Sequence, residues 1–286
     1  MAVDLRYQWK QWGILERLIV INVGVYLVSA LLPFLFQVDS HSLWQWFHMP
    51  KDIFDFLTRP WTLITYAFFH GGIWHLFWNM IMLYFAGRIF LNLFGAKRFI
   101  NVYFLGVVFG GIFFLLSYNL FPVFNNTQAV LLGASAGVMA ILIFVCTYMP
   151  NQEVRLFVFT IKLWYLGVAL VLLDLAQIPI NNSGGHIAHL GGALLGYLYA
   201  SQLTKGNDIG GGFEKIWTGL VNMFKPKPKS HLKTVYRKKE AKPAKDLSKA
   251  ARQRKVDAIL DKIGKSGYSS LTHEEKEFLI NSGKDI

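Results

Sequence analysis

The amino-acid sequence predicts an all-α membrane protein: a bundle of six transmembrane helices followed by a flexible basic C-terminal tail and a small helical hairpin. Hydrophobic residues make up 53% of the 286 positions and charged residues only 16%. A single soluble core has no room for that much apolar surface, so a polytopic membrane protein is the expected class. The apolar residues also gather in long segments, and the excess positive charge gathers near the C-terminus.

Six apolar segments have about the length that an α-helix needs to cross a bilayer core of roughly 30 Å. They cover residues 18–36, 73–93, 99–120, 130–148, 163–178 and 185–203, and the fifth is the shortest. Together they form the predicted membrane domain, residues 1–203.

Lys and Arg residues gather on one side of these segments, which predicts the side that stays in the cytoplasm. They precede the first segment, lie at 88–98 and 155–162, and follow the sixth, whereas the loops 121–128 and 179–184 carry no charge. Both termini are therefore expected in the cytoplasm. No cleavage pattern follows the first segment, so it is expected to remain as an anchor. We predict a multi-pass protein of a bacterial cytoplasmic membrane.

Two connections are expected to have structure of their own. The long loop 37–69 contains Trp and Phe at helical spacing beside acidic residues, which predicts short helices at the outer interface. Residues 153–162 alternate apolar and polar side chains and are expected to run along the inner surface.

The C-terminal part is predicted to be a basic flexible linker, residues 204–255, and a small helical hairpin of unknown function, residues 256–286. From Gln202 onward there are 19 Lys or Arg and 10 Asp or Glu residues, so nine of the twelve excess positive charges lie here. Such a tail attracts anionic lipid headgroups, and no nucleic-acid partner is predicted. Thr272 and Glu275 have the spacing of a capping box that opens a helix.

Polar side chains in a spanning helix are costly, so each is a functional candidate. They lie in or beside three of the predicted spans: His70, His75 and Asn79; Ser135; His186 and His189. Each has a simpler explanation, since a serine bonds back to its own helix, a histidine links two helices, and small residues pack helices together.

The glycines favour the functional interpretation. Gly133 and Gly137 on the fourth span, and Gly192 and Gly196 on the sixth, permit close approach of these two helices. That packing brings a serine hydroxyl and an imidazole within hydrogen-bond reach, as nucleophilic catalysis requires. Side chains on the second span, together with the backbone N–H of the serine, are then expected to stabilise an oxyanion.

Three motifs in order identify a resemblance to the rhomboid proteases over approximately residues 10–203. The matching residues are His75 and Asn79 with the upstream His70, then Gly133-Ala134-Ser135-Ala136, then Ala188-His189 followed by Gly192 and Gly196. The resemblance implies a Ser135–His189 dyad without a carboxylate, a first loop that lies sideways in the outer leaflet, and a lateral gate formed by the fifth span.

The chain departs from the family pattern in two places. Many relatives have Trp-Arg in the first loop, whereas Trp61 is followed by Thr62 here and the arginine is Arg59. Some relatives have a tyrosine one turn after the serine, where this chain has Met139. The dyad pattern favours a packing or gate-side role for Asp174 in the fifth span.

The predicted function is therefore that of an intramembrane serine endopeptidase that cleaves transmembrane segments of other membrane proteins. The alternative is a catalytically inactive rhomboid-like binder of membrane helices, which is expected to lack the serine or the histidine. A metal or haem protein using the four intramembrane histidines is a third class, but no H-E-x-x-H motif supports it. We predict no metal and no cofactor.

Overall fold

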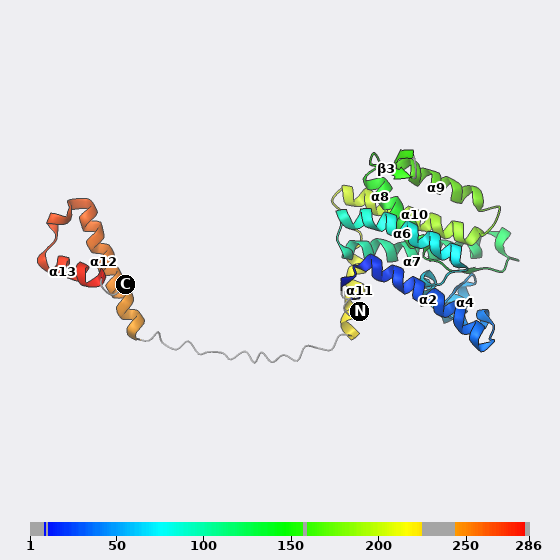
Figure 1. Cartoon of the computed structure of the whole chain (residues 1–286), viewed down its shortest axis with the longest axis horizontal. Helices are drawn as coiled ribbons and strands as arrows, with labels where there is room; N and C mark the ends of the chain where they lie inside the picture. The colour runs from blue at the N-terminus through cyan, green and yellow to red at the C-terminus, as the bar shows by residue number, and fades with distance from the viewer. Residues whose placement is uncertain (1–8, 10, 157–158, 225–243, 284–286) are drawn as a thin grey trace, which may run out of the picture. The chain divides into compact units, whose positions relative to one another are not determined.

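The computed structural model describes residues 9, 11–156, 159–224 and 244–283 and is mostly helical. The chain divides into two compact units, Met1–Lys225 and Pro226–Ile286 (Figure 1).

A helix occupies each of the six predicted apolar segments. These helices are α2 (Ile14–Phe36), α6 (Ile73–Leu93), α7 (Ala96–Leu120), α8 (Ser135–Tyr148), α9 (Leu163–Gln177) and α10 (Ser183–Thr204). Among the described residues, three of them, α2, α6 and α7, are long and apolar enough to cross a membrane. The helices α8 and α9 are apolar but shorter, and glycines and two histidines lower the hydropathy of α10.

Helix α8 lies at the centre of the first unit. Most of its side chains are buried, because α7 and α10 approach it closely through glycines. A methyl group at Gly106 or Gly110 of α7 would collide with the Cβ of Ala140 or Ala136 on α8. At these contacts the helix backbones approach each other closely because no large side chain lies between them, as is usual between membrane helices.

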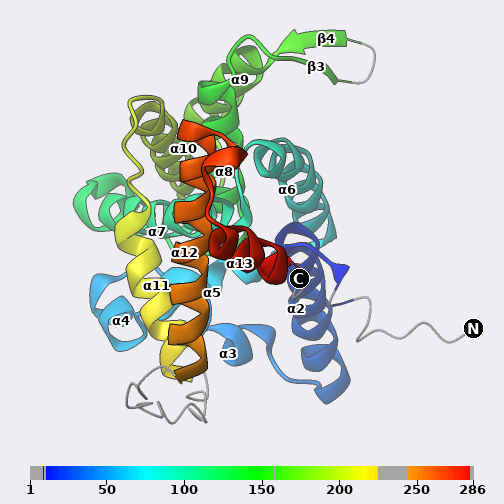
Figure 2. The same ribbon diagram turned by 90° about the vertical axis from the view of Figure 1, so that its left-hand side faces the viewer.

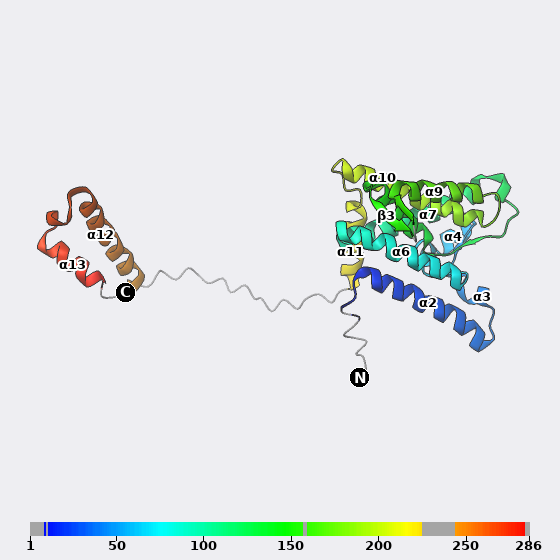
Figure 3. The same ribbon diagram turned by 45° about the horizontal axis from the view of Figure 1, so that its top comes forward.

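Helix α2 lies at the edge of the bundle, beside α6 (Figure 3). Its Leu15 fits against Gly87 of α6, whereas most of its other apolar side chains, such as Leu31 and Leu35, are exposed. An exposed apolar surface of this kind is expected where a helix faces lipid.

The predicted short helices of the first loop are present: α3 (Ser40–Trp44), α4 (Ile53–Thr58), α5 (Thr62–Thr65) and the 3-10 turn η1 (Tyr66–Phe68). Asp39 and Asp52 cap the first two of these helices. Arg59 donates to the carbonyl of Gln45 at 2.8 Å, and the Trp61 indole donates to the carbonyl of Trp46 at 2.7 Å. The loop is thus anchored by Arg59 and Trp61 without a Trp-Arg pair.

The all-α prediction is wrong in detail, because two small antiparallel sheets are present. Strand β1 (Met49–Pro50) pairs with β2 (Val130–Leu131) and ties the first loop to the segment before α8. Since residues 130–131 are extended, α8 begins at Ser135 rather than at 130. Strands β3 (Glu153–Leu156) and β4 (Phe159–Lys162) form a hairpin that projects beyond α9 (Figure 2). The alternation of apolar and polar side chains over residues 153–162 is typical of a strand.

The predicted linker, residues 204–255, is also partly wrong, since it contains α11 (Gly211–Phe224) and the start of α12 (Ala244–Ser266). Ion pairs from Lys97 to Glu214 and from Arg98 to Asp208, each 2.8 Å long, hold α11 and the turn before it against α7. The first compact unit therefore extends beyond residue 203. The basic stretch 225–243 lies outside the described residues.

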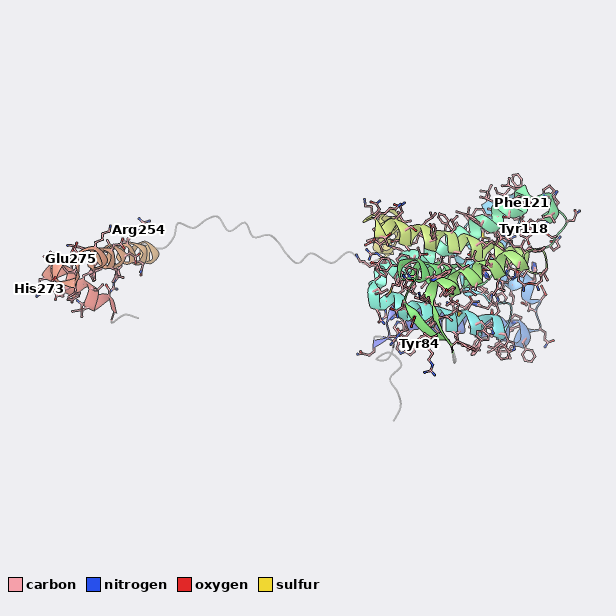
Figure 4. All side chains as sticks on the ribbon, turned by 90° about the horizontal axis from the view of Figure 1, so that it is seen from above. Tyr84, Tyr118, Phe121, Arg254, His273 and Glu275 are labelled. Carbon is pink, nitrogen blue, oxygen red and sulfur yellow. The ribbon has the colours of Figure 1, made fainter. Side chains whose placement is uncertain are left out.

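The second unit contains α12, the 3-10 turn η3 (Tyr268–Ser270) and α13 (His273–Gly283). The predicted capping box is confirmed: the Thr272 N–H donates to the Glu275 carboxylate at 2.9 Å, and the Glu275 N–H donates to Oγ1 of Thr272 at 3.3 Å. Glu275, labelled in Figure 4, also pairs with Lys262 of α12. Ile259 of α12 and Leu271, which follows η3, are buried in this unit.

Candidate active site

Ser135 is the first residue of α8 and lines a cavity of about 440 Å³. The N–H groups in the first turn of a helix have no partner within that helix, so they remain available to an acceptor. Gly133, two residues earlier, has a φ of 120°, a backbone conformation that glycine adopts without a steric penalty. The sharp turn at Gly133 places Ser135 at the N-terminus of α8, beside the cavity.

His189 lines the same cavity from α10. Its Nδ1 lies 2.8 Å from Oδ1 of Asp174 on α9, and Nδ1 of His186 lies 2.7 Å from the same oxygen. The two histidines are three residues apart on α10 and therefore share one face of the helix. An ionised carboxylate only accepts hydrogen bonds, so beside an ionised Asp174 each Nδ1 carries the hydrogen, and a neutral His189 then has a free lone pair on Nε2.

His75 contributes a second imidazole to the cavity, from the first turn of α6. Its Nδ1 accepts a hydrogen bond from the N–H of Gly71 at 3.4 Å. A neutral imidazole that accepts at Nδ1 carries its hydrogen on Nε2, which is the atom that lies against Gly133. His75 and His189 thus have opposite tautomers, one suited to donate a hydrogen bond and the other to accept a proton.

Asn79 is buried one turn below His75 and lines the same cavity. One of its amide hydrogens is bound to the His75 carbonyl at 2.8 Å, so a single amide hydrogen is left for a ligand.

His70 lies just before α6 and is buried. Its Nε2 accepts from the N–H of Ala134 at 3.4 Å, which links this histidine to the turn before Ser135. Burial and the neighbouring His75 lower the pKa of His70 to about 4, so it is neutral at physiological pH. Its contact is with the backbone of the turn, whereas the cavity itself is lined by His75, Asn79, Ser135 and His189.

The four glycines of the sequence motifs do not all lie between α8 and α10. Gly192 and Gly196 do: a methyl group on either would collide with the carbonyl of Ala136 or Ala140 on α8. Gly133 instead faces His75 of α6, and Gly137 faces the ring of Tyr103 on α7. The expected pairing of glycine with glycine is therefore corrected to glycine on alanine, because residues 136 and 140 are the ones that α8 turns toward α10.

Sequence reasoning assigned Asp174 a packing or gate-side role, but its carboxylate contacts both histidines of α10. The available signal was the presence of an acidic residue in an apolar helix, which is costly without a partner. Among the described residues, one group could hold a metal ion: the ligand atoms of Asp174, His186 and His189 lie within 4.8 Å of one another.

A comparison with protein families shows which family the chain belongs to. Residues 57–206 match the family described as the Rhomboid domain, and this match covers just over half of the chain. The chain belongs to the rhomboid family. Rhomboids are generally serine intramembrane proteases that act on membrane proteins within the bilayer. The second unit matches a separate family of unknown function, DUF6576, over residues 246–282.

Several curated rhomboids are similar to this chain. RHOMBOID-like protein 12, mitochondrial, of Arabidopsis thaliana is 29% identical over 70% of this chain and 63% of its own length. Rhomboid protein 1, mitochondrial, of Saccharomyces cerevisiae is 30% identical over 63% of this chain and 54% of its own length. Presenilin-associated rhomboid-like protein A, mitochondrial, of Danio rerio is 31% identical over 56% of this chain and 39% of its own length. The chain thus spans between 39% and 63% of the length of these relatives.

The names of these rhomboids contradict the predicted location. All three are mitochondrial proteins by name, so the prediction of a bacterial cytoplasmic membrane with both termini in the cytoplasm is wrong. The physical reason is that the distribution of Lys and Arg distinguishes the two sides of a membrane but does not identify the membrane.

Proposed function

We propose that this rhomboid is an intramembrane serine endopeptidase that cleaves transmembrane segments of other membrane proteins, with Ser135 as nucleophile and His189 as general base. The observation that carries the proposal is that both side chains line one cavity. The close approach of Gly192, one turn beyond His189, to Ala136, next to Ser135, supports a short separation between them.

In the proposed reaction, Oγ of Ser135 bonds to the scissile carbonyl carbon while its proton passes to Nε2 of His189. The carbonyl oxygen becomes an oxyanion, for which the Ser135 N–H, Nε2–H of His75 and the free amide hydrogen of Asn79 are the proposed donors. The C–N bond breaks as His189 gives the proton to the leaving amine. Water then attacks the acyl-enzyme while His189 takes its proton, the bond between Oγ of Ser135 and the acyl carbon breaks, and His189 returns the proton to Oγ as the second product leaves.

The cavity lies between α6 and α9, which supports lateral entry of a substrate helix. Trp74 and Trp78 of α6 and Leu173 of α9 line it and are themselves more than half exposed. A helix in lipid satisfies its peptide groups internally, so the substrate must unwind before Ser135 reaches a carbonyl. We expect cleavage near Gly, Pro or polar residues, after a small residue.

We further propose that the six helices α2 and α6 to α10 lie in the membrane and that residues 1–203 form the enzymatic domain. The short length of α8 is consistent with this, because a helix surrounded by other helices has little contact with lipid and need not span its full thickness. The polar and small residues of α10 lie against other helices: Gly192 and Gly196 meet α8, Gly184 and Gly191 meet α7, and His186 and His189 contact Asp174 of α9.

The test is cleavage of a transmembrane substrate by the full-length protein reconstituted into vesicles. Wild type should release both fragments and should react with a fluorophosphonate probe, whereas Ser135→Ala and His189→Ala should do neither. Asp55→Asn, which removes an exposed carboxylate in the first loop, is the control that should cleave normally.

Full cleavage by Ser135→Ala would contradict the assignment of the nucleophile. If wild type retains the substrate in pull-down experiments, releases no fragments and does not react with the probe, the protein is an inactive binder of membrane helices. Loss of cleavage on addition of a chelator, in a protein that the probe does not label, would instead favour metal-dependent chemistry.

A further inference from the structure

The carboxylate of Asp174 is the one charged group of α9 and lies almost fully buried, at 7% exposure. Burying a carboxylate is strongly unfavourable unless hydrogen bonds replace its hydration. Here Oδ1 lies 2.7 Å from Nδ1 of His186 and 2.8 Å from Nδ1 of His189. These distances are those of strong charge-assisted hydrogen bonds.

The shared acceptor fixes the chemistry of both imidazoles. Because Asp174 only accepts, each histidine must present Nδ1–H to it, and a rotation of the His189 ring would break this bond. Nε2 of His189 therefore has a lone pair and a fixed direction, which are the two properties that a general base requires. His186 does not line the cavity, and its hydrogen bond to the same oxygen helps to hold the carboxylate in place.

We infer that Asp174 is a positioning residue of the proposed protease: its carboxylate orients His189 and stabilises the imidazolium that forms when His189 takes the proton of Ser135. This inference rests on the proposed function. The proton moves from Oγ of Ser135 to Nε2 of His189, and both Nδ1 hydrogens stay on their rings. His186 is the second donor that keeps the carboxylate at the right place.

The alternative to these hydrogen bonds is a metal ion bound by the same three side chains. The ligand atoms of a tetrahedral zinc site are roughly 3.3 Å apart, since zinc lies about 2.0–2.2 Å from nitrogen and oxygen ligands. The two nitrogen-to-oxygen separations here are clearly shorter and fit hydrogen bonds. The geometry therefore favours a proton on each Nδ1 over a metal.

The experiment compares wild type, Asp174→Asn, Asp174→Glu, His186→Ala, Ser135→Ala and the control Asp55→Asn, all as full-length protein in vesicles. An asparagine amide can donate to Nδ1 and so stabilise the wrong tautomer of His189. For Asp174→Asn we expect kcat to fall on the order of 10²- to 10⁴-fold, with KM within about threefold of wild type. Asp174→Glu should recover part of kcat, and His186→Ala should lose less than Asp174→Asn because the bond to His189 remains.

A second readout is nitrogen-15 NMR of the histidine side chains, with His189 assigned by comparison with His189→Ala. Wild type should show the hydrogen of His189 on Nδ1, and Asp174→Asn should shift it toward Nε2. This readout reports the tautomer of the wild-type protein even if a variant fails to fold. A purely structural role of Asp174 would lower the unfolding temperature without a selective loss of kcat.

The outcomes separate the two proposals. If Ser135→Ala still cleaves, the proposed function fails. If Ser135→Ala is inactive but Asp174→Asn keeps kcat within threefold of wild type, or if wild-type His189 carries its hydrogen on Nε2, the positioning role is overturned and the protease remains. Saturable inhibition of wild type by zinc chloride, lost in His186→Ala and accompanied by metal in the purified protein, would assign the three side chains to a metal and also overturn it.

Discussion

A methyl group on Gly133 would lie 2.8 Å from Cε1 and Nε2 of His75, so the imidazole of His75 packs directly against the backbone of Gly133. The same methyl group would be 3.6 Å from Oγ of Ser135. Gly133 therefore serves two purposes: its φ of 120° makes the turn into α8, and its missing side chain leaves room for the proposed oxyanion donor.

Gly133→Ala should lower kcat by about two orders of magnitude, because displacing His75 removes one oxyanion donor. The added methyl group also strains the backbone, since alanine rarely adopts this φ. Gly72→Ala is the matched control: Gly72 is extended and has open space around it, so this variant should keep its activity. Steady-state cleavage in vesicles measures both, and equal rates for the two variants would contradict the role assigned to Gly133.

His75→Ala should reduce kcat by roughly 10²- to 10³-fold with little change in KM, because the lost donor acts on charge that develops in the transition state. Asn79→Ala should reduce kcat less than His75→Ala does, because one of the two amide hydrogens of Asn79 is already bound to the His75 carbonyl. His41→Ala, which removes an exposed histidine of α3, provides the comparison with no expected change. A larger loss in Asn79→Ala than in His75→Ala would reverse the two assignments.

Gly192→Ala should destabilise the bundle by about 1–3 kcal/mol, because the added methyl group collides with the carbonyl of Ala136 and forces α10 away from α8. Activity should fall as well, since that displacement separates His189 from Ser135. Gly24→Ala adds the same methyl group to α2 where there is open space, so it should be neutral or slightly stabilising. Unfolding in a graded denaturing detergent compares them, and similar stabilities would rule out a tight contact at Gly192.

Acid should weaken the attachment of α11 to the bundle. Burial alone raises the pKa of Asp208, but hydrogen bonds from Tyr199, Arg98 and the Gly210 N–H outweigh it and lower the pKa below the ordinary value. A carboxyl group whose pKa is lower in the folded state stabilises the fold above its unfolded pKa of about 3.9, and this contribution is lost as the pH falls through the folded pKa.

The difference in unfolding temperature between wild type and Asp208→Asn should thus be largest near pH 7 and should shrink in acid. Arg98→Met removes the partner of Asp208, so Asp208→Asn should lower the unfolding temperature less in that background than in wild type. A difference that stays constant from neutral to acidic pH would show that the Asp208 charge has no part in the attachment.

Local patterns account for what could be predicted. The ranges of α6 and of most of α2 and α7 follow from apolar length, and the capping box of Thr272 and Glu275 follows from a spacing of three residues. The extended segment at residues 130–131 could not be found in this way, because its partner strand at 49–50 is eighty residues away in the sequence. Helix α11 was missed because its glycines indicate a break, whereas contacts with Lys97 and Arg98 of α7 help to hold this segment against the bundle.

The sequence by itself determined the family, the order of the apolar helices and the candidate serine and histidines, because motif spacing and hydrophobic length are properties of short stretches of chain. Only the tertiary structure decided that Asp174 meets His186 and His189, that Gly133 faces His75, and that alanines rather than glycines of α8 contact α10. The reason is that these contacts depend on how each helix is rotated about its axis. A helix that is apolar on every side carries no pattern that specifies that rotation.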